Sequence, residues 1–376
     1  MGGNAVIPGC GVPLPDGSGK GNPPDPRGSG ASGAGREKGE YALLKYTVKR
    51  LLMAIPVILG IVTIVFILMR VFSPNPAYLL LGQQATGERA AALTEHLGLN
   101  EPIWKQYLIY LQQIIKGDLG TSLFSKEPVL KELLNRMPAT IELALFAVII
   151  GAVVGVTLGV ICAVHQNSWL DRICQVGGLV GVSMPRFWLG FMLMLAFAVQ
   201  LKWLPPSGRF NFLMRPKEIT GFYIIDCIIT RDGPALVSTL KYMLLPGFCI
   251  AIGSIGSIMR YTRSTMLETI RQDYIRTAQA KGLSQRVVVV RHALKNALIP
   301  VVTVIGMELG GLFSGSVLTE TVFAWPGVGK YIVDGINNSD YAVVQGGCML
   351  VAVISVLMNL LVDLLYGSLD PRIRYS

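Results

Sequence analysis

The sequence predicts an all-α protein that crosses a membrane six times. Of its 376 residues, 52% are hydrophobic and only 15% are charged, whereas soluble domains average about 25% charged residues. Long stretches such as 51–69, 143–164 and 341–362 contain no Asp, Glu, Lys or Arg. Because about 20 apolar residues in a helix cross the hydrocarbon core of a bilayer, each stretch is a candidate span.

Six spans meet this criterion in chain order. Two of them contain one charged residue within an otherwise apolar run, Arg186 in the third and Glu308 in the fifth. No internal repeat relates the two halves of the chain, so an inverted-repeat transporter gains no support. The expected transmembrane helices lie near 48–70, 141–164, 173–201, 238–259, 297–319 and 342–365.

Two segments outside the spans differ in composition. Residues 1–40 are rich in Gly, Pro and Ser and lack a periodic apolar pattern, so they cannot bury enough surface to offset the entropy cost of ordering. We expect a disordered cytoplasmic tail there and a transmembrane domain over 41–376. The long connection 71–138 contains amphipathic stretches at 95–111 and 128–137, which predict short helices that cover the external mouth.

The positive charge is concentrated in one connection. Residues 260–296 hold eight basic and two acidic side chains, a net charge of +6, whereas 71–138, 202–234 and 319–340 carry 0, +2 and −2. Cytoplasmic connections of membrane proteins carry an excess of Lys and Arg, so we expect 260–296 and both termini in the cytoplasm. Nucleic-acid binding does not explain this distribution. An alternative interpretation of 260–296 is a basic surface drawn to anionic lipid.

Motifs for catalysis and metal binding are missing from the sequence. The Gly-Lys pairs at 19–20 and 329–330 lack the spacing and the following Ser or Thr of a phosphate-binding loop. The six cysteines are scattered and the three histidines lie far apart, which predicts neither a metal site nor structural disulfides. We therefore expect a non-catalytic chain without a cofactor of its own.

The hydrophilic segment before the fifth span is predicted to be a compact helical unit. Residues 267–281 have helical character and end at Gly282, a natural C-cap because glycine tolerates the left-handed conformation. A second helix from about 284 to 296 leads back to the membrane. Small residues such as Ala278 are expected on one face among basic side chains, so the unit could seat in a groove of a partner and transmit rigid-body motion.

Three stretches of this segment carry a recognisable motif. They are Asp-Tyr-Ile-Arg-Thr-Ala at 273–278, Ala-Lys-Gly at 280–282 and Arg-His-Ala-Leu-Lys-Asn-Ala-Leu-Ile-Pro at 291–300. Together they resemble the coupling motif of permease subunits in ABC importers. Two departures, Arg-Thr-Ala in place of Glu-Ala-Ala and a longer spacing before the final Pro, are usual for the peptide subgroup.

Further motifs in order along the chain narrow the resemblance. Gly-Asp-Leu-Gly-Thr-Ser at 117–122, Ser-Met-Pro at 183–185, Thr-Glu-Thr-Val-Phe at 319–323 and Trp-Pro-Gly at 325–327 are together similar to B-type permease subunits of bacterial dipeptide and oligopeptide importers. The resemblance covers about residues 46–375. It implies the type I ABC-importer permease fold, with six transmembrane helices, short external helices and a cytoplasmic coupling helix.

The resemblance also implies partners and a role for the basic segment. The chain would pair with a second permease subunit as a heterodimer in the bacterial inner membrane, forming half of the path for di- or oligopeptides. An extracytoplasmic solute-binding protein would deliver the solute, and two ATPase subunits would carry the ATP and Mg. The residues implied in ATPase coupling are Asp273, Tyr274, Arg276, Thr277, Ala278, Lys281, Gly282, Arg291 and Pro300.

The charges inside two spans suggest a polar path. A charge at the centre of a span costs about 3 kcal/mol on insertion scales, so such residues usually face protein or a polar cavity. Arg186 could bind the carboxylate of a peptide zwitterion and Glu308 its amine, with Ser314 and Ser316 beside them. The alternatives are an ion pair between Arg186 and Glu308, pairing with the partner subunit, or snorkelling of Arg186 beside a kink at Pro185. For the two serines the alternative is helix packing.

Other functions stay open on the sequence alone. Related permeases carry nickel chelates or glutathione and share these motifs. A stand-alone secondary transporter, from a different class, would need no ATPase and would move solute by itself along an ion gradient.

Overall fold

The computed structural model describes residues 31–71, 86–96 and 100–369. By its internal packing the chain divides into two units, Met1–Tyr46 and Thr47–Arg374, and the second unit contains all of the candidate spans. Within the described residues the backbone is helical apart from turns, loops and one isolated antiparallel bridge, Thr121 with Pro128. The prediction of an all-α membrane chain is thereby confirmed.

The N-terminal helix begins earlier than the first expected span. Residues 1–30 of the predicted tail lie outside the described residues, but α1 (Ala31–Val71) already begins at Ala31. Residues 31–40 are therefore helical, which corrects this part of the predicted tail. The same helix continues without a break into the first expected span.

Among the described residues, five helical runs are long and apolar enough to cross a membrane. The first is Val48–Leu68 within α1, and the fourth joins α11 (Gln285–Val287), the π-helical η4 (Val288–Leu294) and α12 (Lys295–Gly315). The remaining three are α5 (Val129–Val164), α9 (Gly233–Ile270) and α15 (Tyr341–Leu369). Five of the six expected spans are thus confirmed, although α5 and α9 continue beyond the apolar runs.

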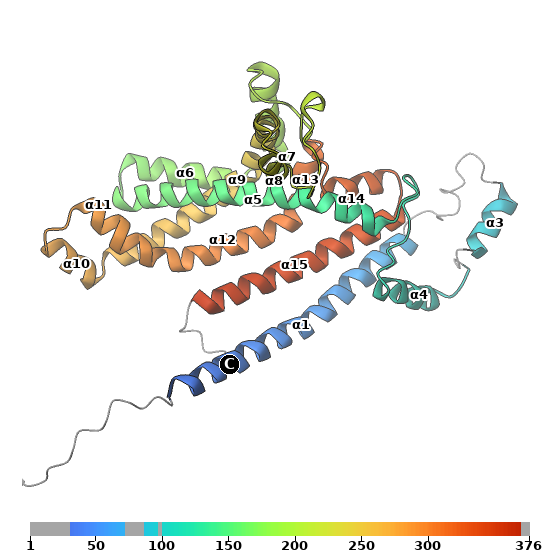
Figure 1. Ribbon diagram of the computed structural model, residues 1–376, viewed down its shortest axis with the longest axis horizontal. Coiled ribbons are helices and arrows are strands. Elements are labelled where there is room, and N and C mark those ends of the chain that lie inside the picture. Colours follow the sequence, from blue (N-terminus) through green and yellow to red (C-terminus); the bar gives the residue numbers. More distant parts are fainter. Residues whose placement is uncertain (1–30, 72–85, 97–99, 370–376) are drawn as a thin grey trace, which may run out of the picture. The chain divides into compact units, whose positions relative to one another are not determined.

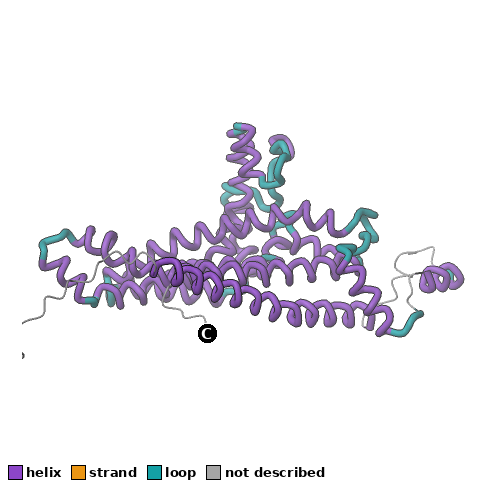
Figure 2. The backbone as a smooth tube through the Cα atoms, turned by 60° about the horizontal axis from the view of Figure 1, so that its bottom comes forward, coloured by secondary structure: helices purple, strands orange, loops and turns teal. Residues whose placement is uncertain are grey.

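The remaining expected span is not one straight helix. α6 (Trp169–Ser183) meets the run of α7 (Arg186–Leu193) and the π-helical η2 (Met194–Gln200) at an angle of 108°. Pro185 causes the break, because a proline disfavours the helical conformation of the residue before it, and Met184 is extended. The run after the bend leaves the long helices steeply (Figure 1, Figure 2). The span expected over 173–201 is thus a bent pair of helical runs, and it is the sixth span if the pair crosses the membrane as one unit.

Short helices occupy the connections expected outside the membrane. α3 (Gly87–His96) and α4 (Ile103–Ile115) flank residues 97–99, which lie outside the described residues. The stretch 128–137 is not a separate helix, because α5 begins at Val129 and continues through Pro138 into the span. The other short helices are η3 (Phe212–Met214), α8 (Tyr223–Thr230), α13 (Val317–Val322) and α14 (Val328–Asn337).

The contact between α5 and α9 is the centre of the second unit. Three glycines recur every four residues along α5 and face α9, namely Gly151, Gly155 and Gly159. A Cβ atom on Gly159 would lie 2.5 Å from the Cβ of Thr262, so the backbones approach too closely for any side chain. Small residues at this spacing allow membrane helices to pack tightly. α6 and α12 also pack on α9, and α15 lies along α12 (Figure 1).

A buried ion pair fixes the 202–222 loop to α5. Arg209 donates through Nη2 to Glu142 Oε2 at 2.6 Å and to the carbonyl of Gly221 at 2.7 Å. The two side chains of the pair are each 5% exposed. The other Glu142 oxygen accepts the Ile224 N–H, and the Arg209 guanidinium lies over the Tyr223 ring. The charges therefore have several partners each, as a buried pair requires.

Replacing Arg209 by Met should destabilise the folded protein by about 3–5 kcal/mol, because the Glu142 carboxylate is left buried without its cation. Thermal unfolding of the purified protein in detergent measures this loss. Arg215→Met is the matched control, because its ion pair with Glu218 is exposed and is worth about 1 kcal/mol or less. Equal losses in the two variants would contradict the role of the buried pair.

Candidate functional site

The candidate coupling segment follows the end of α9. α9 ends at Ile270, Gln272 is extended, and α10 (Asp273–Ala280) begins with an acidic residue, which favours a helix start at that point. The prediction of one helix over 267–281 is therefore wrong. Gly282 has a φ of +76°, the left-handed conformation of a helix C-terminal glycine, and its N–H donates to the carbonyl of Gln279.

One face of α10 is buried against the long helices. Ile275 and Ala278 are both buried, and they belong to one apolar cluster with the end of α5, with α9 and with the start of α12. The other buried members of the cluster are Ala163, Met266, Val288, Val289, Ala293 and Ala297. Ala278 therefore faces the protein, which corrects the expectation of a small-residue surface there. α10 and the ends of three long helices form one packed body.

The opposite face of α10 is exposed and partly basic. The Arg276 side chain is 74% exposed and lies 3.6 Å from the Asp273 carboxylate. The Tyr274 hydroxyl accepts a hydrogen bond from Asn296 Nδ2 at 2.9 Å, which connects α10 to the start of α12. α10 and α11 lie at the same end of the bundle (Figure 1). The other exposed members of the predicted coupling set are Thr277, Lys281, Gly282, Arg291 and Pro300.

A bidentate ion pair joins α6 to α9 next to this segment. Arg263 donates through Nε and Nη2 to the two oxygens of Asp171, at 2.7 and 2.8 Å. Asp171 is buried and also accepts from Gln175 and from the N–H of Asn167. Sequence reasoning missed this pair, because its members are 92 positions apart and neither carries a local signal for the other.

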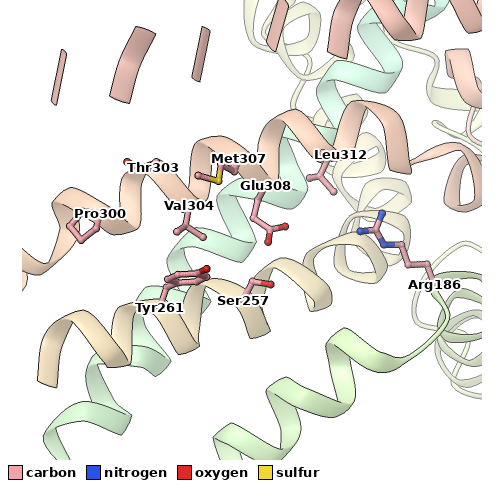
Figure 3. Close-up of a pocket in the computed structure, with 10 residues that line it drawn as sticks. Arg186, Ser257, Tyr261, Pro300, Thr303, Val304, Met307, Glu308 and Leu312 are labelled. Carbon is pink, nitrogen blue, oxygen red and sulfur yellow. The ribbon is translucent and has the colours of Figure 1, made fainter. Parts of the chain in front are cut away.

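A cavity of about 550 Å³ lies between α9, α12 and the start of α7. Both charges predicted from the apolar runs face it (Figure 3). Glu308 extends from α12 toward α9, and Arg186 reaches toward the same space from the bend after α6. Pro300, which the motif assigned to coupling, lies on α12 and lines the cavity. The structure thus places Arg186 and Glu308 around one cavity, which Pro300 also lines from α12.

Hydroxyl groups supply further polar atoms of the cavity. Glu308 accepts a hydrogen bond from Ser254 Oγ at 2.8 Å, and Ser257 and Tyr261 of α9 line the space (Figure 3). Thr303 Oγ1 is buried and has no hydrogen-bond partner among the described residues. Sequence reasoning missed these residues, because a hydroxyl inside an apolar run gives no pattern of its own.

The two serines predicted beside Glu308 do not complete this lining. The Ser314 side chain lies outside the part of the chain that is described. Ser316 is buried and donates from Oγ to Glu320 Oε1 at 3.0 Å. Glu320 also accepts from Thr140 Oγ1 at 2.9 Å and from the Lys330 N–H at 3.1 Å. Burial raises the pKa of the Glu320 carboxyl above its ordinary value, although these hydrogen bonds act in the opposite direction.

The cavity and the coupling segment share their supporting helices. α9 provides one wall of the cavity and leads directly into α10, and α12 provides the other wall and contributes Ala297 to the cluster beneath α10. A displacement of α10 therefore moves the ends of the cavity walls, because close-packed interiors transmit strain. The arrangement can link an event at the exposed face of α10 to the width of the cavity.

Comparisons with known proteins assign the chain to a family. Residues 155–375 match the family described as binding-protein-dependent transport system inner membrane component, and residues 43–144 match its N-terminal membrane region. The dipeptide transport system permease proteins DppB of Alkalihalophilus pseudofirmus and Escherichia coli K12 are 47% and 42% identical to this chain. The glutathione transport system permease protein GsiC of Salmonella choleraesuis is 34% identical. Each alignment covers 89% of this chain and 100% of the relative.

These matches extend over the spans, the cavity and the coupling segment. They confirm the resemblance to ABC-importer permeases that the motifs indicated. The relatives named as dipeptide permeases also confirm that the resemblance is to the peptide type. The chain belongs to the binding-protein-dependent transport system inner membrane components, the multi-pass permease subunits of ABC importers.

Proposed function

We propose that this chain forms half of the path by which an ABC importer carries dipeptides or short oligopeptides across the inner membrane. The observation that carries the proposal is the cavity that Arg186 and Glu308 both line. Charged residues inside membrane spans are rare, usually face the bundle interior or a polar cavity, and often mark a substrate path. The similarity to relatives named as dipeptide permeases supports the same substrate class.

The side chains of the cavity match the groups that all short peptides share. The planar guanidinium of Arg186 suits a carboxylate, with which it can form two parallel hydrogen bonds. The Glu308 carboxylate suits the terminal ammonium. Val304 and Met307 add apolar surface, and a flexible Met side chain adapts to differently shaped neighbours. If the cavity binds the two termini of a peptide and contacts the peptide side chains only loosely, it would accept many different peptides.

The partners follow from the surfaces of the chain. Tyr261 lines the cavity and is exposed, so a second permease subunit is proposed to close this side as part of a heterodimer. The exposed face of α10 is proposed to dock one of two ATPase subunits, which bind the ATP and Mg. A solute-binding protein is proposed to dock on the segments 71–138 and 320–340. The excess of basic residues in 260–296 supports the proposal that this segment and both termini lie in the cytoplasm.

The proposed cycle uses α10 as a lever. ATP binding closes the ATPase subunits and draws α10 with them. Because Ile275 and Ala278 are packed against α5, α9 and η4, the ends of the cavity walls move with α10 and the path opens to the docked binding protein. Hydrolysis returns the path to the inward-facing state. Each ligand needs only to bind one of the two states more tightly.

Glutathione is a second candidate substrate. It is itself a small peptide-like zwitterion, and the relative named as a glutathione permease covers the same share of this chain at 34% identity. The higher identity to the relatives named for dipeptides favours dipeptides. A stand-alone secondary transporter does not fit a member of a binding-protein-dependent family.

Reversal of the Arg276 charge should separate the permease from its ATPase. We expect Arg276→Glu to weaken ATPase binding by at least about tenfold, or 1.4 kcal/mol, because the exposed side chain meets the partner and not the core. Co-purification of ATPase subunits with tagged permease in mild detergent measures the loss. Lys131→Glu, an equal charge change on an exposed residue of α5, is the control. Full ATPase recovery with Arg276→Glu would contradict docking on this face.

Neutralising the cavity charges should slow peptide uptake. Arg186→Gln and Glu308→Gln each remove a charge-assisted hydrogen bond, worth about 1.5–3 kcal/mol, so we expect roughly tenfold slower uptake or more. Uptake of a labelled dipeptide by proteoliposomes that contain the assembled importer is the measurement. Arg186→Lys should recover part of the rate, because it restores the charge without the planar fork. Uptake at the normal rate in both Gln variants would refute a path through this cavity.

A further inference from the structure

The apolar face of α4 is wider than the part of it that other residues of the protein cover. One half of its surface carries apolar and aromatic side chains, and the opposite side is mainly polar, with Lys105, Gln112 and Gln113. Only part of the apolar half is covered. No residue of α4 is fully buried. The helix therefore has exposed apolar surface, which is not expected of a helix that faces water on that side.

The covered part of α4 packs on the last turns of the first membrane span. The Tyr107 hydroxyl and Thr63 Oγ1 are 2.6 Å apart. The rings of Tyr107 and Tyr110 lie 5.2 and 5.5 Å from the ring of Phe66, which is only 2% exposed. Thr63 and Phe66 precede the end of the span at Leu68 by about 8 and 3 Å, at 1.5 Å per residue. α4 thus lies at the depth of the final turns of a membrane helix.

The open part of the apolar face points away from these contacts. Trp104, Leu108 and Ile115 follow one another along the helix at spacings of four and seven, which places them on one side. Trp104 is 66% and Ile115 is 85% exposed. The side chains of α1 at the same level are also apolar and exposed, including Ile64 and Ile67. Both helices therefore have exposed apolar side chains at this level of the span.

We propose that α4 is an interfacial helix that lies in the membrane surface with Trp104, Leu108 and Ile115 among the lipids. Such a helix buries its apolar face by about 5–10 Å at the boundary between headgroups and acyl chains, which matches the depth set by Thr63 and Phe66. Tryptophan is enriched at this level, and Lys105 and Lys116 can reach the headgroups. α4 thereby anchors the 71–138 connection to the bilayer.

Fluorescence quenching of Trp104 tests this placement. The assembled importer is reconstituted in phosphatidylcholine nanodiscs whose lipids are brominated either near the headgroup or near the methyl end of the acyl chains. The signal of Trp104 is the difference between wild type and Trp104→Phe. We expect stronger quenching by bromine near the headgroup than by bromine near the methyl end, and weak quenching by acrylamide in the water.

Two charge-adding variants separate the apolar flank from the polar side. Leu108→Glu should lift the flank from the lipid, so that Trp104 loses the bromolipid quenching and gains quenching by acrylamide. Gln112→Glu adds the same charge on the polar side and should change neither. Wild-type Trp104 quenched by acrylamide alone would show a water-exposed helix, and protection from both quenchers would show a protein partner. Either result overturns the proposal and leaves the cavity and α10 untouched.

Discussion

The close approach of α5 and α9 is the contact on which most other helices of the second unit pack. Gly155 and Gly159 leave no room for side chains at this contact, so the two helices cannot shift past one another without a clash. α9 continues from this contact to α10 and carries one wall of the cavity. α5 runs from Glu142 near the external connections to Ala163 in the cluster beneath α10. The pair is a rigid axis between the two ends.

The two ends of that axis are held by different forces. Near the external connections, buried charged groups with many hydrogen bonds fix the loops, as Glu142 with Arg209 and Glu320 with Thr140 illustrate. Such networks tolerate little rearrangement, because a group that loses its partners stays buried and unsatisfied. Beneath α10 the contacts are apolar and non-directional. These apolar contacts can adjust to small shifts of α10, and the hydrogen bond between Asn296 and Tyr274 keeps α10 attached to α12.

The spans could be predicted because a helix in lipid must be apolar over its full length, and hydropathy reports this directly. Pro185 gave a local signal for a kink, but hydropathy could not predict that the bend reaches 108°. Gly282 was predictable because few residues other than glycine readily adopt the left-handed conformation that it has. The burial of Ala278 was not, since a small residue suits both a surface and a tight core. The pairs of Arg209 with Glu142 and Arg263 with Asp171 join distant positions, and composition alone does not connect them.

The two faces of α10 are under different sequence constraints. Ile275 and Ala278 must suit the chain's own core, whereas Arg276, Thr277 and Lys281 meet only what lies outside. Substitutions on the outer face can therefore accumulate without cost to folding, and those on the inner face cannot. A permease of this design could exchange one ATPase for another through a few surface changes while its membrane helices stayed as they are. The residues that select the ATPase and the residues that pack α10 against the membrane helices would then evolve independently.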